Sequence, residues 1–269
     1  MKNLNTNVKP TWCPGCWNFQ ILAGVKNVLQ KQKGDTAIVS GIGCHAKIYD
    51  YLNLPGLNSL HGRVLPVCLG LKVGNPNLNV VGFSGDGDAY AEGIAHLVHA
   101  ARYNSDFKYI VHNNQVFALT VGQPTPVTEK GFIDKTTPLG VKLESLNPVK
   151  LMLSVGASFV ARVFADVKQV QEVVEEALKH KGFAFIEVIQ PCLIFHPDPG
   201  YKEKTYMMKD HDKTDLQEAM KKAEEFDYNK VEKIPLGIFY QKERPTFEDL
   251  QPSLAKLKKT KKSWRDIKR

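Results

Sequence analysis

The sequence predicts an α/β fold in which a mostly parallel sheet is flanked by helices, and three observations support this. Short apolar runs alternate with helical patterns along most of the chain. The runs are almost continuously apolar, which is typical of parallel strands buried on both faces. Glycine-rich or polar motifs follow several runs, among them "GIG", "GDGD" and "HNN". Because the carboxyl ends of parallel strands meet at one edge of a sheet, we expect these motifs to gather there.

The first predicted element is a helix over 18–31, which carries Ile21, Val25 and Leu29 on one face. The elements after it are a strand at 36–40, a helix at 63–74, a strand at 79–84, a helix at 89–103 and a strand at 108–113. The strands are bounded by glycine and polar residues, and the helices have the length of crossover connections between parallel strands.

Residues 115–145 predict a long loop, because they contain several prolines and glycines. Asn147 and Pro148 predict a helix start, with a cap followed by proline at the first helical position. The later predicted elements are a strand at 159–164, a helix opened by Asp166 and a strand at 183–189. Beyond Pro197 the pattern weakens to one amphipathic helix (213–226) and a basic tail. We therefore predict a main domain over 1–200 and a C-terminal extension over 201–269.

Composition and charge narrow the class of protein. No apolar run is long enough to span a bilayer, and the N-terminus lacks the apolar core of a signal peptide, so we expect a cytoplasmic protein with reduced cysteines. From Lys256 onward the chain has eight basic residues and one acidic residue. A solvated, partly disordered tail is the favoured interpretation; a subunit contact, an acidic protein partner and nucleic acid are alternatives. Nucleic acid is the weakest of these, because aromatic and basic residues are not interleaved.

The motif "GDGD" follows the predicted strand 79–84, and "NN" follows the strand 108–113. Asp86 stands 28 residues before Asn114, and one crossover should bring the two together. Gly85 and Gly87 allow close approach of an anion, and the helix N-terminus favours phosphate. Carboxylate and amide oxygens beside a phosphate suit Mg²⁺. This pattern resembles the thiamine diphosphate-binding motif, which implies that Asp86, Asn114 and the backbone carbonyl of Val116 hold Mg²⁺.

The chain contains five cysteines. We expect four of them to converge at the same edge of the sheet, namely Cys13, Cys16, Cys44 and Cys192. A [4Fe–4S] cluster that accepts electrons is the favoured interpretation, while a structural zinc ion, a thiol couple and plain burial of the cysteines remain alternatives. Cys68 lies in "LPVCLGL" and is expected to be a small core residue.

With both motifs in view, the chain resembles the beta subunits of 2-oxoacid:ferredoxin oxidoreductases over roughly residues 8–200. The motifs that carry the likeness are "WCPGC", "GIGCHAK", "LHGR", "GDGD", "NN" followed by "ALT", and "QPC". The resemblance implies a thiamine diphosphate-binding (diphosphate-domain) fold, and one [4Fe–4S] cluster held by Cys13, Cys16, Cys44 and Cys192. Residues implied to line the coenzyme site are Ile42, Gly43, Cys44, His45, Gly87, Asp88, Ala118 and Leu119. Lys47, His61 and Arg63 are implied to act on substrate or coenzyme.

Three positions depart from the usual family pattern. Trp17 and Gln20 replace glycines near the second cysteine, and "LTVGQ" has Val121 where "LTGGQ" has glycine. These changes remove no expected ligand, but they place bulk beside the cysteines and alter a loop expected to contact phosphate. His112, on the strand before "NN", is equally compatible with a packed core residue and a position near the coenzyme.

The resemblance also implies a reaction and its partners. Thiamine enzymes carry an activating glutamate on a pyrimidine-binding domain, for which this chain has no room, so we expect an alpha subunit to supply it. The implied reaction is coenzyme A-dependent oxidative decarboxylation of a 2-oxoacid, such as 2-oxoglutarate or pyruvate, with electrons passed to ferredoxin. Two alternatives remain: a non-redox thiamine decarboxylase or ligase with structural zinc, and a non-catalytic assembly subunit. No membrane or nucleic-acid partner is expected.

Overall fold

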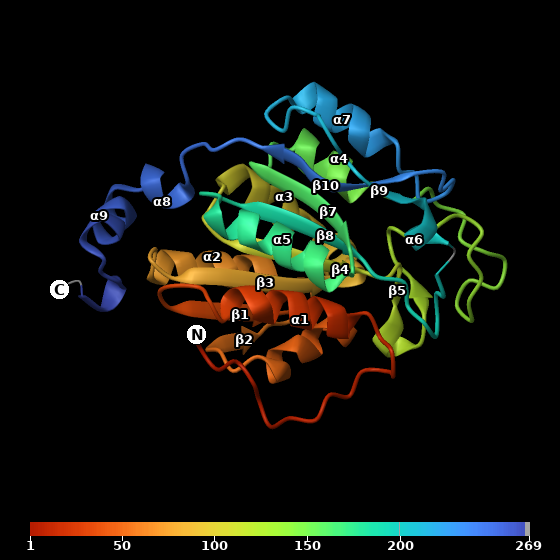
Figure 1. Cartoon of the computed structure of the whole chain (residues 1–269), viewed down its shortest axis with the longest axis horizontal. Coiled ribbons are helices and arrows are strands. Elements are labelled where there is room, and N and C mark those ends of the chain that lie inside the picture. The colour runs from red at the N-terminus through yellow and green to blue at the C-terminus, as the bar shows by residue number, and fades with distance from the viewer. Residues whose placement is uncertain (199, 267–269) are drawn as a thin grey trace.

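The computed structural model describes residues 1–198 and 200–266 and is built around one eight-stranded sheet (Figure 1). The strand order is β2-β1-β3-β4-β8-β7-β10-β9. The strands are β1 (Thr36–Ser40), β2 (Gly56–Asn58), β3 (Asn79–Gly85), β4 (Lys108–Asn113), β7 (Phe159–Phe164), β8 (Ala184–Ile189), β9 (Thr205–Met207) and β10 (Ile234–Gln241). Every pair in it is parallel except β7 with β10. The prediction of a mostly parallel sheet flanked by helices is therefore confirmed.

Helices cover both faces of the sheet. The α-helices are α1 (Asn18–Leu29), α2 (Val64–Gly74), α3 (Ile94–Tyr103), α4 (Pro148–Ser154), α5 (Val167–Lys179), α6 (Tyr201–Lys204), α7 (Leu216–Glu224), α8 (Phe247–Leu250) and α9 (Pro252–Thr260). One apolar core is shared by the sheet with α2, α3, α4 and α7, and the other by the sheet with α1 and α5. Helices α1 and α5 pack closely because Gly24 has no side chain; a Cβ there would lie 2.8 Å from Val170 Cβ.

The predicted elements of the main domain are present with small shifts at their ends. Asp166 caps α5 and Asn147 caps α4, as their positions in the sequence predict. The helix predicted over 89–103 is divided: a π-helical turn, η2 (Gly87–Glu92), is followed by α3 from Ile94. π-helical turns occur often at functional sites, and this one follows the "GDG" motif directly.

The region after residue 200 contains more structure than the single helix that the sequence predicts. That helix is α7, capped by Asp215. Strand β10 was missed, and it pairs antiparallel with β7, so the extension completes the same sheet as residues 1–198. Pro235 and Gly237 lie inside β10, and both residues weaken the sequence signal for a strand.

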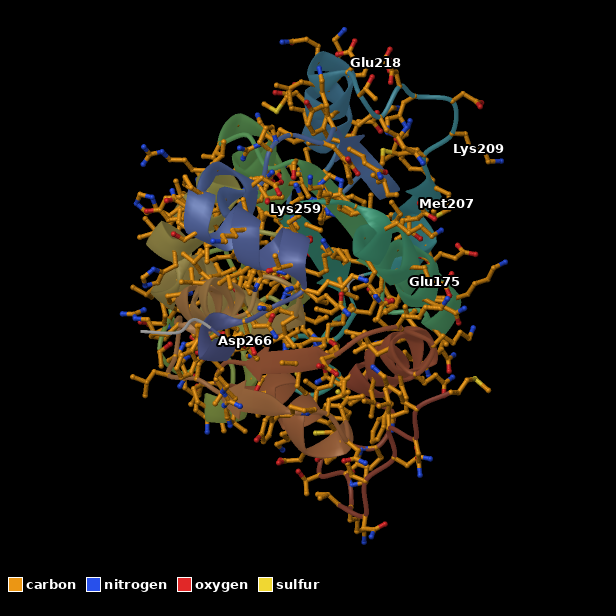
Figure 2. The ribbon with its side chains drawn as sticks, turned by 90° about the vertical axis from the view of Figure 1, so that its left-hand side faces the viewer. Glu175, Met207, Lys209, Glu218, Lys259 and Asp266 are labelled. Carbon is orange, nitrogen blue, oxygen red and sulfur yellow. The ribbon has the colours of Figure 1, made fainter. Side chains whose placement is uncertain are left out.

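The basic C-terminal segment is folded as far as Asp266, so the expectation of a partly disordered tail is wrong for this part. Helix α9 buries Leu254 and Leu257, and Asn77 donates from Nδ2 to the carbonyl of Leu257 at 3.4 Å and of Lys262 at 3.0 Å. Residues 267–269 lie outside the described part. Figure 2 shows this segment with Lys259 labelled, at the side of the molecule that faces left in Figure 1. This is far from β5, where the motif loops gather.

The remaining elements are short. They are the β5–β6 hairpin (Val116–Phe117 and Gln123–Pro124) and the 3-10 helices η1 (Cys44–Tyr51), η3 (Ala118–Thr120) and η4 (Trp264–Asp266). The hairpin and η3 lie inside the segment predicted as loop, 115–145. No helix in the described ranges is long and apolar enough to cross a membrane.

Candidate active site

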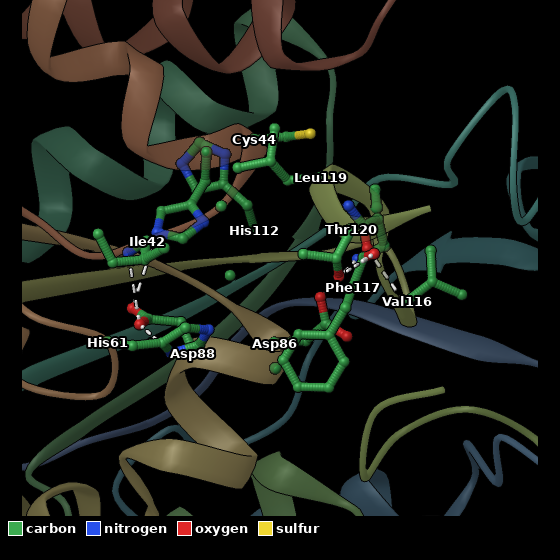
Figure 3. Close-up of a pocket in the computed structure, with 16 residues that line it drawn as sticks. Ile42, Cys44, His61, Asp86, Asp88, His112, Val116, Phe117, Leu119 and Thr120 are labelled. Carbon is green, nitrogen blue, oxygen red and sulfur yellow. Dashed lines mark hydrogen bonds and ion pairs between the residues drawn. The ribbon is translucent and has the colours of Figure 1, made fainter. Parts of the chain in front are cut away.

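A pocket of about 80 Å³ lies at the carboxyl ends of β1, β3 and β4, and we call it the coenzyme pocket (Figure 3). Its wall consists of Ile42, Gly43, Cys44, His45, His61, Gly85, Asp86, Gly87, Asp88, His112, Asn114, Val116, Phe117, Ala118, Leu119 and Thr120. All eight residues expected to line a coenzyme site are among them, as are the three expected magnesium ligands. The structure therefore brings these predicted residues together, although their contacts with a bound coenzyme stay predictions.

Asp86 and Asn114 are in contact, as their positions after neighbouring strands predict. The backbone N–H of Asn114 donates to Asp86 Oδ1 at 3.2 Å, and Thr125 Oγ1 donates to Asp86 Oδ2 at 2.6 Å. The Asn114 side-chain oxygen accepts from the backbone N–H of Val116 at 3.1 Å. Asp86 is only 2% exposed, and burial raises its pKa to about 7 against the weaker lowering effect of these hydrogen bonds.

The surroundings of Asp86 fit a divalent cation. Both groups that hydrogen-bond to this carboxylate are neutral, and a buried carboxylate is stabilised most by a nearby positive charge. Asn114 keeps a second lone pair on its amide oxygen, and Val116 contributes a buried wall residue whose carbonyl is an additional oxygen donor. An oxygen-only donor set of this kind suits Mg²⁺.

Asp88 joins two loops of the pocket wall. Its Oδ1 accepts from the backbone N–H of Gly62 at 2.7 Å and lies 2.9 Å from His61 Nδ1, and its Oδ2 accepts from Ser84 Oγ at 2.6 Å. Gly41 must be glycine, because a Cβ there would lie 1.9 Å from Asp88 Oδ2. The Asp88 carboxylate is thus bound to other groups of the protein, and its predicted contact with phosphate stays a prediction.

The loop from Phe117 to Gly122 closes the pocket on another side. A Cβ on Gly87 would lie 2.2 Å from Phe117 Cε1, so glycine is needed for the close approach of this ring. Val121 has a φ of 75°, in the left-handed region that a β-branched residue rarely adopts. This is the position where the usual family pattern has glycine, so the substitution strains the loop by roughly 1–2 kcal/mol.

Two buried histidines contribute to the pocket wall. Burial and the nearby His61 lower the pKa of His45 to about 3, and burial and the nearby His45 hold the pKa of His112 well below its usual range. Both rings are therefore neutral. His112 Nδ1 lies 2.8 Å from Asn18 Oδ1. The sequence is compatible with His112 as a packed core residue or as a residue near the coenzyme. The structure supports the second interpretation, because His112 lies in the wall of the coenzyme pocket.

The residues with predicted roles in catalysis occupy different places. His61 is in the wall of the coenzyme pocket. Lys47 is not; its Nζ donates to the carbonyl of Thr11 at 3.1 Å, beside the cysteines. Arg63 lies outside both pockets and donates from one guanidinium nitrogen to the carbonyl of Glu92 at 3.0 Å. Their roles in catalysis stay predictions, with His61 placed closest to the coenzyme.

A second pocket, of about 70 Å³, adjoins the first, and we call it the cysteine pocket. Its wall includes the four cysteines expected to converge, Cys13, Cys16, Cys44 and Cys192. Cys68 lies on α2, outside both pockets, and is buried in the core, as the sequence predicts. The two pockets share Cys44, Asn114 and Ala118, so they lie on either side of one thin wall.

Two of the thiols lack the lowered pKa that a reactive nucleophile needs. Burial raises the pKa of Cys16, and it raises the pKa of Cys44 to about 11 although Lys47 acts in the opposite direction. A thiol exchanger needs a lowered thiol pKa, so these two thiols do not support that alternative. No three histidine, cysteine, aspartate or glutamate side chains in the described ranges stand as close as a single metal ion requires. In a [4Fe–4S] cluster each thiolate binds its own iron, so four cysteines around one pocket fit it.

Backbone geometry holds the cysteine loops in place. The indole N–H of Trp12 donates to the carbonyl of Cys44 at 2.7 Å, and the N–H of Cys16 donates to the carbonyl of Cys13 at 3.0 Å. The tight turn between the two cysteines has Gly15 at a φ of 77°. The N–H of His196 donates to the carbonyl of Cys192 at 3.1 Å.

A buried polar network lies beneath the coenzyme pocket. Arg162 and Glu187 are fully buried, and Arg162 Nε lies 2.7 Å from Glu187 Oε2. Glu187 Oε1 accepts from Tyr90, Tyr228 and Asn113, the residue before Asn114. The network therefore fixes the strand end from which Asn114 projects.

Several residues of the site were not predicted from the sequence. Thr125 donates a hydrogen bond to Asp86. The others are Phe117 and Thr120, in the wall of the coenzyme pocket, and Asn18 and Trp12, beside the cysteines. Thr125 lies in the predicted loop, 39 residues from its partner, so no local pattern connects the two. Asn18 follows Cys16 by two positions, and this proximity was the one available signal.

Comparisons with known proteins agree with this geometry. Residues 41–188 match the family model described as the C-terminal TPP binding domain of thiamine pyrophosphate enzymes. Residues 200–256 match the model described as the C-terminal part of the pyruvate ferredoxin oxidoreductase beta subunit.

Curated relatives and solved structures extend the likeness to most of the chain. The 2-oxoacid:ferredoxin oxidoreductase subunit beta of Saccharolobus solfataricus is 40% identical, over 86% of this chain and 82% of the relative. The 2-oxoglutarate synthase subunit KorB of Archaeoglobus fulgidus is 35% identical, over 87% and 94% of the two chains. A solved 2-oxoglutarate:ferredoxin oxidoreductase from Magnetococcus marinus, with 2-oxoglutarate, coenzyme A and succinyl-CoA bound, superposes with a TM-score of 0.88. It is 33% identical and covers 96% of this chain and 89% of that chain.

The matching domain model, the identity over most of the chain and the shared fold agree with one another and with the motifs around the two pockets. The chain therefore belongs to the family of beta subunits of 2-oxoacid:ferredoxin oxidoreductases.

Proposed function

We propose that this chain is the catalytic beta subunit of an enzyme that oxidatively decarboxylates a 2-oxoacid to an acyl-CoA and CO₂ and passes the electrons through a [4Fe–4S] cluster to ferredoxin. The observation that carries the proposal is the wall shared by the two pockets, made by Cys44, Asn114 and Ala118. It sets a coenzyme site and a set of four cysteines side by side. Electron transfer between a coenzyme and a cluster needs this kind of proximity.

Thiamine diphosphate supplies an electron sink for decarboxylation when it is bound. In the proposed site, Asp86, Asn114 and the carbonyl of Val116 hold Mg²⁺, and the backbone at Gly87 and Asp88 meets the diphosphate. The first N–H groups of a helix have no partner within it, and η2 starts at Gly87, which supports a diphosphate contact there. Phe117 and Leu119 contribute apolar surface to the wall of the pocket.

The four cysteines are the proposed ligands of the cluster. Binding iron requires them to lose their protons, and the raised pKa values of Cys16 and Cys44 oppose this unless positive charge is present. Lys47, on the wall of the same pocket, lowers the pKa of Cys44 and so favours its thiolate. Zinc in this pocket is the alternative that direct metal analysis distinguishes.

An exposed apolar rim surrounds both pockets and supports the proposed alpha subunit. Ile42 and Leu119 border the coenzyme pocket, and Leu193 and Ile194 border the cysteine pocket; all four side chains are exposed. Exposed apolar residues grouped around a site are typical of an interface. We propose that the alpha subunit covers this rim and contributes the pyrimidine-binding domain. The net charge of +8 suits an acidic ferredoxin, and we expect the enzyme in the cytoplasm.

The test is to purify the chain anaerobically with its partner and to measure iron, acid-labile sulfide, zinc and thiamine diphosphate in the complex. Reduction of ferredoxin or a viologen dye is then followed with coenzyme A and 2-oxoglutarate, pyruvate and branched 2-oxoacids. Cys16→Ser is expected to lower the iron content and abolish reduction, whereas Cys68→Ser, in the core, leaves both unchanged. Zinc without iron in an active decarboxylase would contradict the redox proposal. Unchanged activity of Asp86→Ala would favour the assembly-subunit alternative.

A further inference from the structure

Asn18 lies between the two pockets and contacts residues of both. It is 1% exposed, it is part of the wall of the cysteine pocket, and its side-chain Oδ1 lies 2.8 Å from His112 Nδ1. His112, also 1% exposed, is part of the wall of the coenzyme pocket. The side chain of Asn18 is therefore a direct polar connection between the cysteine side and the coenzyme side.

Both ends of this connection have unused hydrogen-bonding capacity. Asn18 Nδ2 and His112 Nε2 are buried and have no well-formed hydrogen bond to any described residue. Leaving buried polar atoms unpaired costs about 1–3 kcal/mol each, so native proteins usually pair them with a ligand or water. On the cysteine side a recipient is at hand, because Asn18 lines the same pocket as the four cysteine side chains.

We propose that Asn18 and His112 form a hydrogen-bonded bridge in which the Asn18 amide donates to sulfur in the cysteine pocket and holds His112 as an acceptor toward the coenzyme pocket. This proposal rests on the proposed function, since it gives a role to two residues that lie between the proposed cluster site and the proposed coenzyme site. Asn18 and His112 are positioning residues in it.

The orientation of the amide follows from charge. Thiolates and cluster sulfides carry negative charge, so the NH₂ end of Asn18 faces them and the oxygen end faces His112. An amide oxygen can only accept, so His112 must donate from Nδ1. The neutral ring then has its lone pair on Nε2. The hydrogen bond from Asn18 to sulfur therefore determines which tautomer of His112 faces the coenzyme pocket.

The bridge predicts a linkage between the two sites. Hydrogen bonds to cluster sulfur stabilise the reduced, more negative state and raise the reduction potential. Reduction of the cluster strengthens the hydrogen bond from Asn18 to sulfur, and this changes the affinity for thiamine diphosphate through His112. Since coupling between two sites is reciprocal, thiamine diphosphate must also change the cluster potential.

The test uses the complete complex with its partner, loaded with cofactors, and two replacements of Asn18 that separate its two bonds. Asn18→Leu removes both bonds. Asn18→Asp keeps an acceptor for His112 and removes the donor to sulfur. Three quantities are measured: the cluster midpoint potential by EPR-monitored titration, the tautomer of His112 by ¹⁵N NMR of histidine-labelled protein, and the dissociation constant of thiamine diphosphate with the cluster oxidised and reduced. His112→Gln assigns the NMR signal.

The expected results differ between the variants. Both variants lower the midpoint potential. Asn18→Asp retains the His112 tautomer, whereas Asn18→Leu loses it and weakens thiamine diphosphate binding by about 3- to 10-fold, the value of one net hydrogen bond. In the unmodified protein the dissociation constant differs between oxidised and reduced cluster, and in Asn18→Leu this ratio falls to one.

A matched control is present in the same chain. His180 is also a buried histidine, with Nε2 2.8 Å from Ser158 Oγ and an unpartnered Nδ1, but it lies in neither pocket. Ser158→Ala should move only the His180 signal and leave the potential and the dissociation constant unchanged.

Two outcomes overturn the bridge in different ways. Absence of iron or thiamine diphosphate from the unmodified complex refutes the proposed function and the bridge together. Full cofactor content combined with a His112 protonated on Nε2, or with an unchanged potential in both folded Asn18 variants, refutes the bridge and leaves the proposed function intact. Thermal melts of the variants establish that they are folded.

Discussion

The most direct consequence of the structure concerns Asp86 and the pH dependence of stability. In the unfolded chain an aspartate has its ordinary pKa, 3.8, and in the fold burial raises the pKa of Asp86 to about 7. The folded state therefore binds the proton more tightly than the unfolded state does. Stability of the cofactor-free chain must fall as pH rises from about 4 to about 7, and level off above that.

The size of this effect follows from the two pKa values. The destabilisation from Asp86 is about 2 kcal/mol at pH 5 and about 4 kcal/mol at pH 8, so raising the pH between them removes on the order of 2–3 kcal/mol. For a chain of this size that corresponds to roughly 5–10 °C in the melting temperature. Asp86→Asn, which does not titrate, should lack this component.

The assay is thermal unfolding of the purified chain at several pH values, comparing the unmodified protein with Asp86→Asn. The difference between their melting temperatures should change steadily between pH 5 and pH 7. Adding Mg²⁺ with thiamine diphosphate should raise the melting temperature of the unmodified chain more at pH 8 than at pH 5, because the cation needs the ionised carboxylate. Parallel curves for the two proteins at all pH values would refute a raised pKa for Asp86.

Two further predictions test the pocket wall and its support. Gly87→Ala should weaken thiamine diphosphate binding at least tenfold in an equilibrium titration, because the added Cβ displaces Phe117. As a control, Gly70→Ala has no atom within 4 Å of the added Cβ, so it should leave binding unchanged and stabilise α2 by about 1 kcal/mol. Equal binding by both variants would contradict this prediction. Arg162→Met should lower the free energy of unfolding by about 3–5 kcal/mol in denaturant titration, because Glu187 is left buried without its cationic partner. A loss below about 1 kcal/mol would contradict this prediction.

The main sheet was predictable because its strands are buried on both faces. β1, β3, β4, β7 and β8 are short, mostly apolar runs bounded by polar or glycine residues, a pattern and a length that are typical of buried strands. β10 lies toward the far edge of the sheet and contains Pro235 and Gly237. β10 forms a strand because it pairs with β7. This long-range contact cannot be read from the local sequence pattern.

The location of the site was predictable for a related reason. Asp86 and Asn114 follow neighbouring parallel strands, so the strand-end rule alone brings them together. The contacts of Thr125 and Asn18 were not predictable, because they depend on how a loop folds back and how a helix turns. A resemblance to a family suggests the role of a residue but does not give its position in the fold. The structure puts Lys47 and Arg63 outside the coenzyme pocket.

The strand order explains why two pockets share a wall. Asp86 and Asn114 follow β3 and β4, which are neighbours in the sheet, while Cys44 and Cys192 come after β1 and β8, the strands on either side of that pair. The cysteine loops must therefore flank the loops that provide oxygen ligands, and Cys13 and Cys16 reach the same edge from the start of α1. Asn114 belongs to both pockets because it projects from β4, next to β8. A displacement of the Cys192 loop would thus alter the wall that the two pockets share, to which Asn114, a proposed magnesium ligand, belongs.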